Sequence, residues 1–213
     1  MTDLIRIKIK SRAEQSNMKT GIFGGAFNPI HNGHIALAKN YLNHLGLDRI
    51  VFVPTHIPPH KTNEDFASET DRMAMLNLAI KNCSAFEADD CEFRREGKSY
   101  TYDTICDFKS RCEDELFLIV GEDQYLYFDK WYKYEQILDM VTLLTASRHS
   151  DKYNELIEYK STHPFMKNSV VSNFDVIELS SSQIRQMVKN NEDVSSLVPT
   201  GVAEYIKEQG LYV

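Results

Sequence analysis

The sequence lacks the features that would place the chain in a membrane or send it out of the cell. No apolar run reaches the roughly 18 to 20 residues that a membrane-spanning helix needs. The basic segment over residues 1–17 contains no apolar core of signal-peptide length, so we expect a cytoplasmic protein without a membrane partner. Cysteine is scarce and forms neither a CxxC pair nor a metal-ligand spacing, which predicts reduced thiols and no structural zinc (Cys83, Cys91, Cys106, Cys112).

Positive charge is also in short supply. The chain has 24 Lys and Arg against 31 Asp and Glu, a net charge of −7. Removing the five basic and two acidic residues of positions 1–20 leaves 19 against 29, a net charge of −10. Because nucleic acids are held by Lys and Arg at their phosphates, we expect no nucleic-acid partner. An anionic small molecule remains a candidate ligand where cations gather in one cleft.

Two common nucleotide-binding patterns are missing. Neither the Walker pattern GxxxxGK[ST] nor GxGxxG occurs, which disfavours a P-loop NTPase and a dinucleotide site of the usual kind. The chain also contains no internal repeat, low-complexity tract or Pro/Gly/Ser linker. At 213 residues it is long enough for one well-buried domain, which we expect over residues 18–213, after an N-terminal arm over residues 1–17.

Short apolar runs alternate with segments of helical period along the chain. The pattern predicts strands that are uninterrupted in their apolar character, which is typical of a parallel sheet covered by helices on both faces. In such a doubly wound α/β fold, ligands bind beyond the carboxyl ends of the strands. The predicted strands are 19–24, 49–54, 85–89, 116–121, 141–146 and 170–179, and the predicted helices are 33–46, 69–82, 101–111, 181–190 and 199–209.

The stretch GIFGGAFNPIHNGH, residues 21–34, concentrates glycine and histidine at the first strand-to-helix turn. Four of the nine glycines of the chain lie in it. Glycine lets the backbone approach a ligand closely, and a helix start offers free N–H groups to an anion. His31 and His34, three residues apart at that start, can both face a phosphate. A tight turn with two solvated histidines is the plain alternative, which the length of the whole string makes less favourable.

Two further segments carry groups that suit an anion. In LSSSQIR, residues 179–185, Ser180 and Gln183 form a capping-box pattern, and Arg185 lies in the first turn of the predicted helix. Plain helix capping and an anion site are compatible interpretations here. The loop VPTHIPPHK, residues 53–61, follows the second predicted strand and bears His56, His60 and Lys61, although such loops are often only solvated.

The remaining candidates lie in the middle of the chain. Gly121 and Asp123 follow the most apolar strand, and Trp131 and Tyr132 come shortly after. The single tryptophan is either a core anchor or a ligand-stacking ring. In EGKSYTYDTI, residues 96–105, backbone N–H groups at a predicted helix start near Thr101 suit a carboxylate, unless they are simply capped.

Together these segments resemble one family over nearly the whole chain. GGAFNPIHNGH resembles the GGxFxPxHxGH motif of the nucleotidyltransferase superfamily, and LSSSQIR is similar to its ISSTxIR motif. The segments VPTHIPPHK, SYTYDTI, GEDQ and KWY resemble those of bacterial nicotinate-nucleotide adenylyltransferases. The chain departs from the usual pattern at Asn28, Ile30 and Ser182, and none of these changes removes a phosphate-binding group. The resemblance implies a Rossmann-like fold of the HxGH nucleotidyltransferase type.

The resemblance also implies a reaction, in which the phosphate of nicotinate mononucleotide attacks the α-phosphorus of ATP in line and gives deamido-NAD and pyrophosphate, a step of NAD biosynthesis. No enzyme nucleophile is needed, since the attacking phosphate is already ionised. By this resemblance His31, His34 and Arg185 are catalytic. The nicotinate mononucleotide site comprises His56, Lys61, Thr101, Trp131 and Tyr132, and the ATP site comprises Gly24, Gly25, Phe27, Gly33, Gly121, Asp123, Ser180, Ser181 and Arg185.

The implied cofactor is Mg²⁺, which accompanies ATP, and we expect no resident metal held by protein ligands. The expected partners are the two small-molecule substrates, and the protein is either a monomer or a homodimer. Three alternatives stay open: a sister transferase acting on phosphopantetheine or with cytidylyl donors, a nucleotide-sensing protein that has lost catalysis, and an RNA-binding protein. Intact His31, His34 and Arg185 count against lost catalysis. Chain length and net charge count against RNA.

Overall fold

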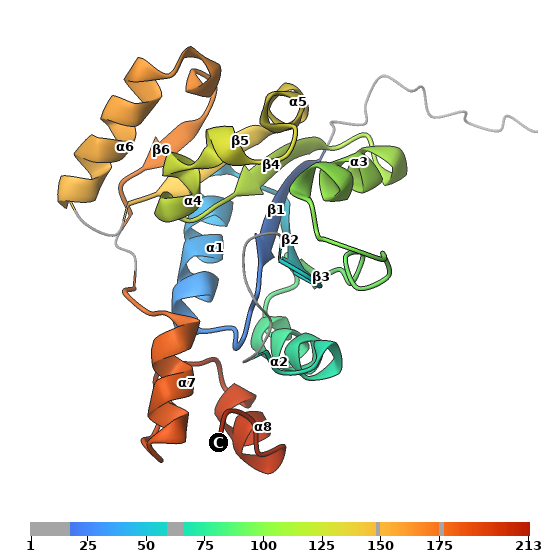
Figure 1. Ribbon diagram of the computed structural model, residues 1–213, viewed down its shortest axis with the longest axis vertical. Helices are drawn as coiled ribbons and strands as arrows, with labels where there is room; N and C mark the ends of the chain where they lie inside the picture. Colours follow the sequence, from blue (N-terminus) through green and yellow to red (C-terminus); the bar gives the residue numbers. More distant parts are fainter. Residues whose placement is uncertain (1–17, 59–65, 148–149, 175–176) are drawn as a thin grey trace, which may run out of the picture.

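In the computed structural model, which describes residues 18–58, 66–147, 150–174 and 177–213, six parallel strands form one sheet (Figure 1). The strands lie in the order β3-β2-β1-β4-β5-β6, and each neighbouring pair is parallel. Their bounds are β1 Lys19–Gly25, β2 Arg49–Pro54, β3 Phe86–Ala88, β4 Glu115–Ile119, β5 Thr142–Ala146 and β6 Val170–Ser172.

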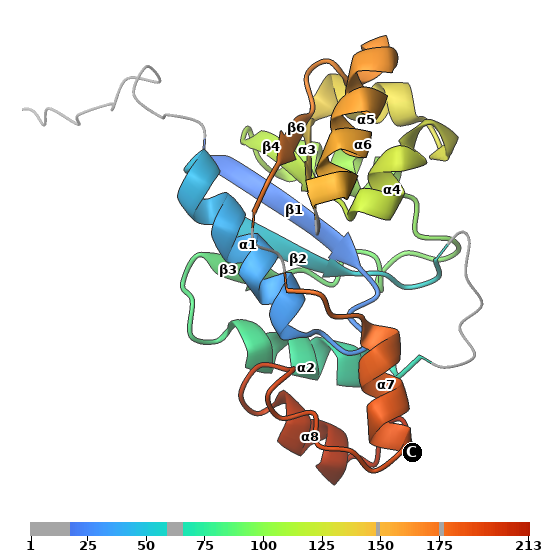
Figure 2. The same cartoon turned by 90° about the vertical axis from the view of Figure 1, so that its left-hand side faces the viewer.

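Helices cover both faces of the sheet, as Figure 2 shows for α1 on one side and α3 to α6 on the other. Neighbouring strand residues alternate between the two faces: Phe23 packs with α1 and α2, whereas Ile22 packs with α3, α4 and α5. The helices are α1 Asn32–Leu45, α2 Glu69–Ile80, α3 Thr101–Arg111, α4 Glu122–Leu126, α5 Tyr134–Met140, α6 Ser150–Thr162, α7 Ser181–Lys189 and α8 Val202–Glu208, with 3-10 turns at Phe128–Lys130 and Pro164–Met166.

The strand order reverses at β1, and this places the candidate site. The chain moves outward from β1 through β2 to β3, and then returns to β4 on the other side of β1. The loops that leave β1 and β4 therefore diverge to opposite faces, which opens a crevice at their carboxyl ends. The predicted motifs of residues 24–34, 53–61 and 121–123 follow β1, β2 and β4 respectively, so all three begin at this one edge of the sheet.

The doubly wound fold predicted from the sequence is confirmed, but the last predicted strand is longer than the observed one. We expected a strand over residues 170–179, whereas β6 covers only Val170–Ser172. The reason is that β6 is an edge strand that pairs with β5 alone, and β5 ends at Ala146, so nothing remains to pair with beyond Ser172. The short helices α4 and α5 and the polar helix α6 were not predicted. The predicted arm over residues 1–17 lies outside the described residues.

No helix in the described part of the chain is long and apolar enough to cross a membrane.

Candidate active site

The glycine-rich loop between β1 and α1 is shaped around the ring of Phe27. Phe27 is 1% exposed and has a left-handed backbone with a φ of 44°. A Cβ atom on Gly25 would lie 3.1 Å from this ring, so the ring occupies the space that a side chain would take. The ring also meets Phe23 edge-on, with centroids 5.6 Å apart. The buried Phe27 ring thus anchors the loop to the core, and the loop backbone lies next to the crevice.

The two histidines of the loop stack on each other at the start of α1. Their ring centroids are 3.6 Å apart with an interplanar angle of 25°. The His31 backbone N–H donates to Nδ1 of His34 at 3.2 Å, so the neutral His34 ring carries its proton on Nε2. The edge of Phe27 holds the same ring, at a centroid distance of 5.1 Å. His31 is buried and His34 is half-buried. The contacts orient the His34 ring at the helix start, with Nδ1 bonded to the His31 backbone.

Gly33 lies between these histidines and has no room for a side chain. A Cβ atom there would lie 3.0 Å from the Ile177 carbonyl oxygen and 3.1 Å from Nδ1 of His31. The carbonyl is backbone and cannot swing away as a side chain can, so a methyl group at Gly33 displaces the start of α1 together with the His31 ring.

We therefore expect Gly33→Ala to lower kcat by about tenfold, because the sequence predicts a catalytic role for the histidines beside Gly33 and a small misplacement of such groups is costly. Initial rates with both substrates at saturation measure this loss. Lys39→Ala, at an exposed position of the same helix, is the control and should leave the rate unchanged. If Gly33→Ala turned over at the wild-type rate, the His31 ring would not need the position seen here.

Helix α7 is bonded directly to the glycine-rich loop, although the two segments are about 150 residues apart in sequence. Ser181 Oγ donates to the Pro29 carbonyl at 2.8 Å. Arg185 Nη1 donates to the Asn28 carbonyl at 3.0 Å. Figure 2 shows α7 beyond the arrowhead of β1. Ser180 caps the helix by accepting from the Gln183 N–H at 3.1 Å, and the full capping box predicted from the sequence is present. The structure thus brings Ser180, Ser181 and Arg185 beside His31.

Gly121 and Asp123 lie across the crevice from the glycine-rich loop. Gly121 is the N-cap of α4, directly after β4, and Asp123 is in the first turn of that helix. The Asp123 carboxylate lies next to the Cα atom of Gly121. A Cβ atom on Gly121 would lie only 2.7 Å from Asp123 Oδ1, so a side chain there would displace the carboxylate. Asp123 is exposed and accepts from its neighbour Gln124 at 3.1 Å.

The loop after β2 is held by side chains from two other elements. Nδ1 of His56 pairs with the Glu69 carboxylate at the start of α2. The His56 backbone N–H donates to Ser99 Oγ at 3.1 Å. His56 therefore faces α2 and the segment before α3, with one ring nitrogen already bonded. Lys61 lies outside the described residues.

The third predicted group, Thr101, Trp131 and Tyr132, is partly brought together. The rings of Tyr100 and Tyr132 lie 4.7 Å apart, which joins the start of α3 to the segment after α4. Tyr100 is the N-cap of α3 and makes no capping bond through its side chain, so plain capping by that residue does not occur. Trp131 is half-buried with its ring 5.0 Å from Phe128, so it is packed against the core without being enclosed by it.

Behind this group lies a buried carboxyl that sequence reasoning missed. Glu92 is 6% exposed and accepts from Thr104 Oγ1 at 2.7 Å. Burial raises the pKa of Glu92 above its ordinary value, although bonds from Thr104 and Ser99 oppose the shift. Arg95 donates to the same Thr104 oxygen at 2.7 Å. This network fixes the start of α3. The sequence gives no sign of it, because an acidic residue in a polar turn is usually exposed.

We expect the Glu92→Gln substitution to remove a pH-dependent loss of stability. Because the pKa is raised in the folded protein, the wild type loses stability as the pH rises from the ordinary Glu range through that raised value. Glutamine keeps an acceptor for Thr104 and cannot ionise. The free energy of unfolding of the variant should therefore gain on the wild type as the pH rises through that window, which urea titrations at a series of pH values measure. Parallel pH curves for the two proteins would contradict this.

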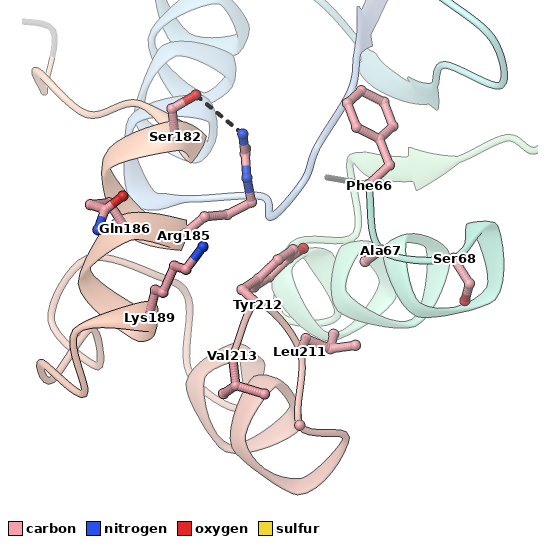
Figure 3. Close-up of a pocket in the computed structure, with 11 residues that line it drawn as sticks. Phe66, Ala67, Ser68, Ser182, Arg185, Gln186, Lys189, Leu211, Tyr212 and Val213 are labelled. Atoms are coloured by element: carbon pink, nitrogen blue, oxygen red, sulfur yellow. Dashed lines mark hydrogen bonds between the residues drawn. The ribbon is translucent and has the colours of Figure 1, made fainter. Parts of the chain in front are cut away.

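A pocket of about 560 Å³ lies beside Arg185 (Figure 3). Arg185 and Lys189 extend into it from α7, and Phe66 and Ala67 form the opposite wall. Tyr212 lies between Arg185 and Ala67 in Figure 3 and donates to Asn28 Oδ1 at 2.8 Å, so the C-terminal segment also supports the glycine-rich loop. The remaining lining residues are Ser68, Ser182, Gln186, Gly210, Leu211 and Val213.

Among the described residues, no group of three or more His, Cys, Asp or Glu side chains could hold a metal ion. The groups that gather at the end of β1 are imidazoles, hydroxyls and a guanidinium. This donor set suits phosphate oxygens, whereas Mg²⁺ prefers carboxylate and phosphate oxygens.

Comparison with known proteins shows the family of the chain. The family model described as cytidylyltransferase-like matches residues 22–187. The chain is 38% identical to the nicotinate-nucleotide adenylyltransferase of Bacillus subtilis (strain 168), covering 91% of this chain and 98% of the relative. It is 40% identical to the probable nicotinate-nucleotide adenylyltransferase of Borreliella burgdorferi, covering 92% and 97%. The nicotinic acid mononucleotide adenylyltransferase of Plasmodium falciparum, solved with NaAD, has the same fold at a TM-score of 0.76 and 18% identity, over 92% of this chain and 98% of that one. The chain belongs to the cytidylyltransferase-like nucleotidyltransferases and, within them, to the nicotinate-nucleotide adenylyltransferase family.

Proposed function

We propose that the protein transfers the adenylyl group of ATP to the phosphate of nicotinate mononucleotide, giving deamido-NAD and pyrophosphate in NAD biosynthesis. The observation that supports this best is the bonding of α7 to the glycine-rich loop. Through Arg185 and Ser181, it gathers two imidazoles, two hydroxyls and a guanidinium at the end of β1. That collection serves charge on phosphate and contains no nucleophile activated by a base.

ATP is proposed to bind with its phosphates over the start of α1. The Nε2–H of His34 faces the α-phosphate, and His31 supports the ring while lining the same phosphates. Ser180, Ser181 and Arg185 hold the β- and γ-phosphates, and the glycine-rich loop (Gly24, Gly25, Phe27, Gly33) allows the close approach. Gly121 and Asp123 line the adenosine. Catalysis then consists of positioning and of stabilising charge on the transferring phosphorus and on the leaving pyrophosphate.

Nicotinate mononucleotide is proposed to bind between the loop after β2 and the start of α3. His56 and Lys61 neutralise its phosphate, and Trp131 stacks on its pyridine ring. Backbone N–H groups near Thr101 and Tyr132 receive its carboxylate, a role supported by the contact between Tyr100 and Tyr132. An amide in place of the carboxylate needs an acceptor as well as donors, so nicotinamide mononucleotide is disfavoured by about 1–3 kcal/mol.

Mg²⁺ is proposed to enter as part of the ATP substrate. The candidate protein groups are hydroxyls and cations, so the phosphate oxygens of ATP supply the ligands that the metal prefers. When bound, the metal neutralises charge on the leaving pyrophosphate. Residues 18–213 are proposed to act as one catalytic domain, and the choice between monomer and homodimer stays a prediction.

The experiment is pyrophosphate release by the purified protein with ATP and Mg²⁺, comparing nicotinate mononucleotide, nicotinamide mononucleotide and phosphopantetheine. Turnover on the first, at least tenfold above the second in kcat/KM, is the expected result. Turnover on phosphopantetheine alone would make the protein a sister transferase. ATP binding without release for every acceptor would favour a nucleotide-sensing protein.

A further inference from the structure

A buried arginine, Arg72 of α2, lies under the two loops that are proposed to hold the substrate phosphates. It is 2% exposed, and its guanidinium lies between the rings of Phe66 and Phe93, 5.2 and 5.0 Å from their centroids. Taking a cation out of water is costly unless its donors are satisfied. Here Nε and Nη1 of Arg72 donate to three backbone carbonyls.

Each carbonyl belongs to a different segment of the site. Nη1 donates to the Ala26 carbonyl at 3.0 Å and to the Thr55 carbonyl at 2.7 Å. Nε donates to the Ala67 carbonyl at 3.3 Å. Ala26 leads into the glycine-rich loop, Thr55 precedes His56, and Ala67 donates its own N–H to Asn28 Oδ1 at 2.9 Å.

The sheet itself cannot hold these loops together. Pairing between β1 and β2 ends at Gly25 and Pro54, and the last bond runs from the Thr55 N–H to the Gly25 carbonyl at 2.9 Å. The next carbonyl on each strand, Ala26 and Thr55, has left the ladder, and one nitrogen of Arg72 joins the two. Arg72 therefore continues the connection between β1 and β2 by one step, at the point where their loops begin to carry substrate groups.

We propose that Arg72 is a positioning residue that sets the distance between the ATP-phosphate loop and the mononucleotide-phosphate loop. The proposal rests on the proposed function, since it assigns those two loops to the two reacting anions. In-line transfer requires the attacking oxygen and the α-phosphorus to be held in near-attack geometry, and a misplacement of about 1 Å costs about a hundredfold in rate. Each loop still binds its own substrate without Arg72, so the loss falls on kcat.

The test compares Arg72→Lys with Arg49→Lys. Arg49 lies at the opposite end of β2 and bonds Thr20, Glu87 and Asp114, so its replacement weakens the same sheet away from the site. Lysine keeps the charge at either position and loses the planar fork that reaches several acceptors. We expect Arg72→Lys to lower kcat by about 10- to 100-fold with the KM for ATP within about threefold of wild type. Arg49→Lys should lower the urea midpoint and leave kcat within about twofold.

Three results would overturn the proposal. The first is a kcat for Arg72→Lys within about twofold of wild type, and the second is an equal loss of kcat in Arg49→Lys. The third is a rise in the KM for ATP that accounts for the whole loss of kcat/KM in Arg72→Lys. If Arg72→Lys does not fold, Phe93→Leu removes one of the two rings packed on the guanidinium and so loosens the guanidinium on its three carbonyls. It should lower kcat several-fold at constant KM for ATP, and an unchanged kcat would refute the role. Absence of turnover in the wild type would instead refute the proposed function.

Discussion

Replacing His34 with alanine is expected to lower kcat by about 10²- to 10³-fold, the loss found when one preorganised donor to a developing charge is removed. The stacked arrangement, with Nδ1 accepting from the His31 backbone N–H at 3.2 Å, fixes the His34 tautomer whose Nε2–H is proposed to donate to the α-phosphate. ATP binding should weaken far less than kcat falls, because the charge on the phosphorus grows in the transition state. Single-turnover rates together with the dissociation constant for ATP measure both effects.

A second substitution separates catalysis from the folding of α1. In His34→Asn the side-chain oxygen lies where Nδ1 was and accepts from the same backbone N–H, but nothing replaces Nε2. The asparagine variant should therefore be more stable than the alanine variant and lose as much kcat. His44→Ala, at the exposed end of the same helix, should leave both unchanged. Near-wild-type turnover by His34→Asn would show that His34 serves the helix and not the phosphate.

The second large effect is expected at Arg185. Arg185→Met should lower kcat/KM for ATP by about 10²-fold or more, because it removes a charged donor from the polyphosphate site and the bond to the Asn28 carbonyl. Arg185→Lys should recover part of the loss, since lysine restores the charge but not the fork. Pyrophosphate release over a range of ATP concentrations gives these values.

The control for this series is Arg94→Met. Arg94 is an exposed arginine that pairs with Asp89 and Asp90 after β3, an edge strand that carries none of the proposed site residues. Its loss should leave kcat/KM unchanged. If Arg185→Met bound and used ATP as the wild type does, α7 would be a structural prop for the glycine-rich loop and nothing more.

The sheet was predictable because its strands are apolar on both faces. Ile22 and Val51 pack in the core on one face of the sheet, and Phe23 and Phe52 pack in the core on the other. Because both faces are buried, the strands are continuous apolar runs in the sequence. The edge strand β6 was predicted too long because apolar residues continue to alternate with polar ones after Ser172, beyond the end of its partner β5. Helix α2 was predicted, but the sequence did not indicate that Arg72 lies on its buried face beside Met75 and Leu76. A charged residue at a core spacing gives no sign of which carbonyls it will meet.

The candidate site was predictable where its groups lie close together in sequence. His31, Gly33 and His34 lie in one turn. Ser180 and Gln183 are three residues apart and form a capping box that the sequence pattern predicts. The bonds from α7 to Asn28 and Pro29 join residues about 150 positions apart, so only the resemblance suggested that they share a site. The support from Tyr212 and Glu92 could not be predicted, because each depends on a packing contact that leaves no periodic pattern.

The most direct test of the central claim is the stereochemical course at the α-phosphorus. The protein is given adenosine 5′-(α-thio)triphosphate of one configuration with nicotinate mononucleotide, and the configuration of the dinucleotide product is determined. Direct in-line transfer between two positioned anions predicts inversion. Retention would mean two successive displacements through an adenylylated side chain, with His34 the first to examine, and would contradict a site that works by position and charge alone.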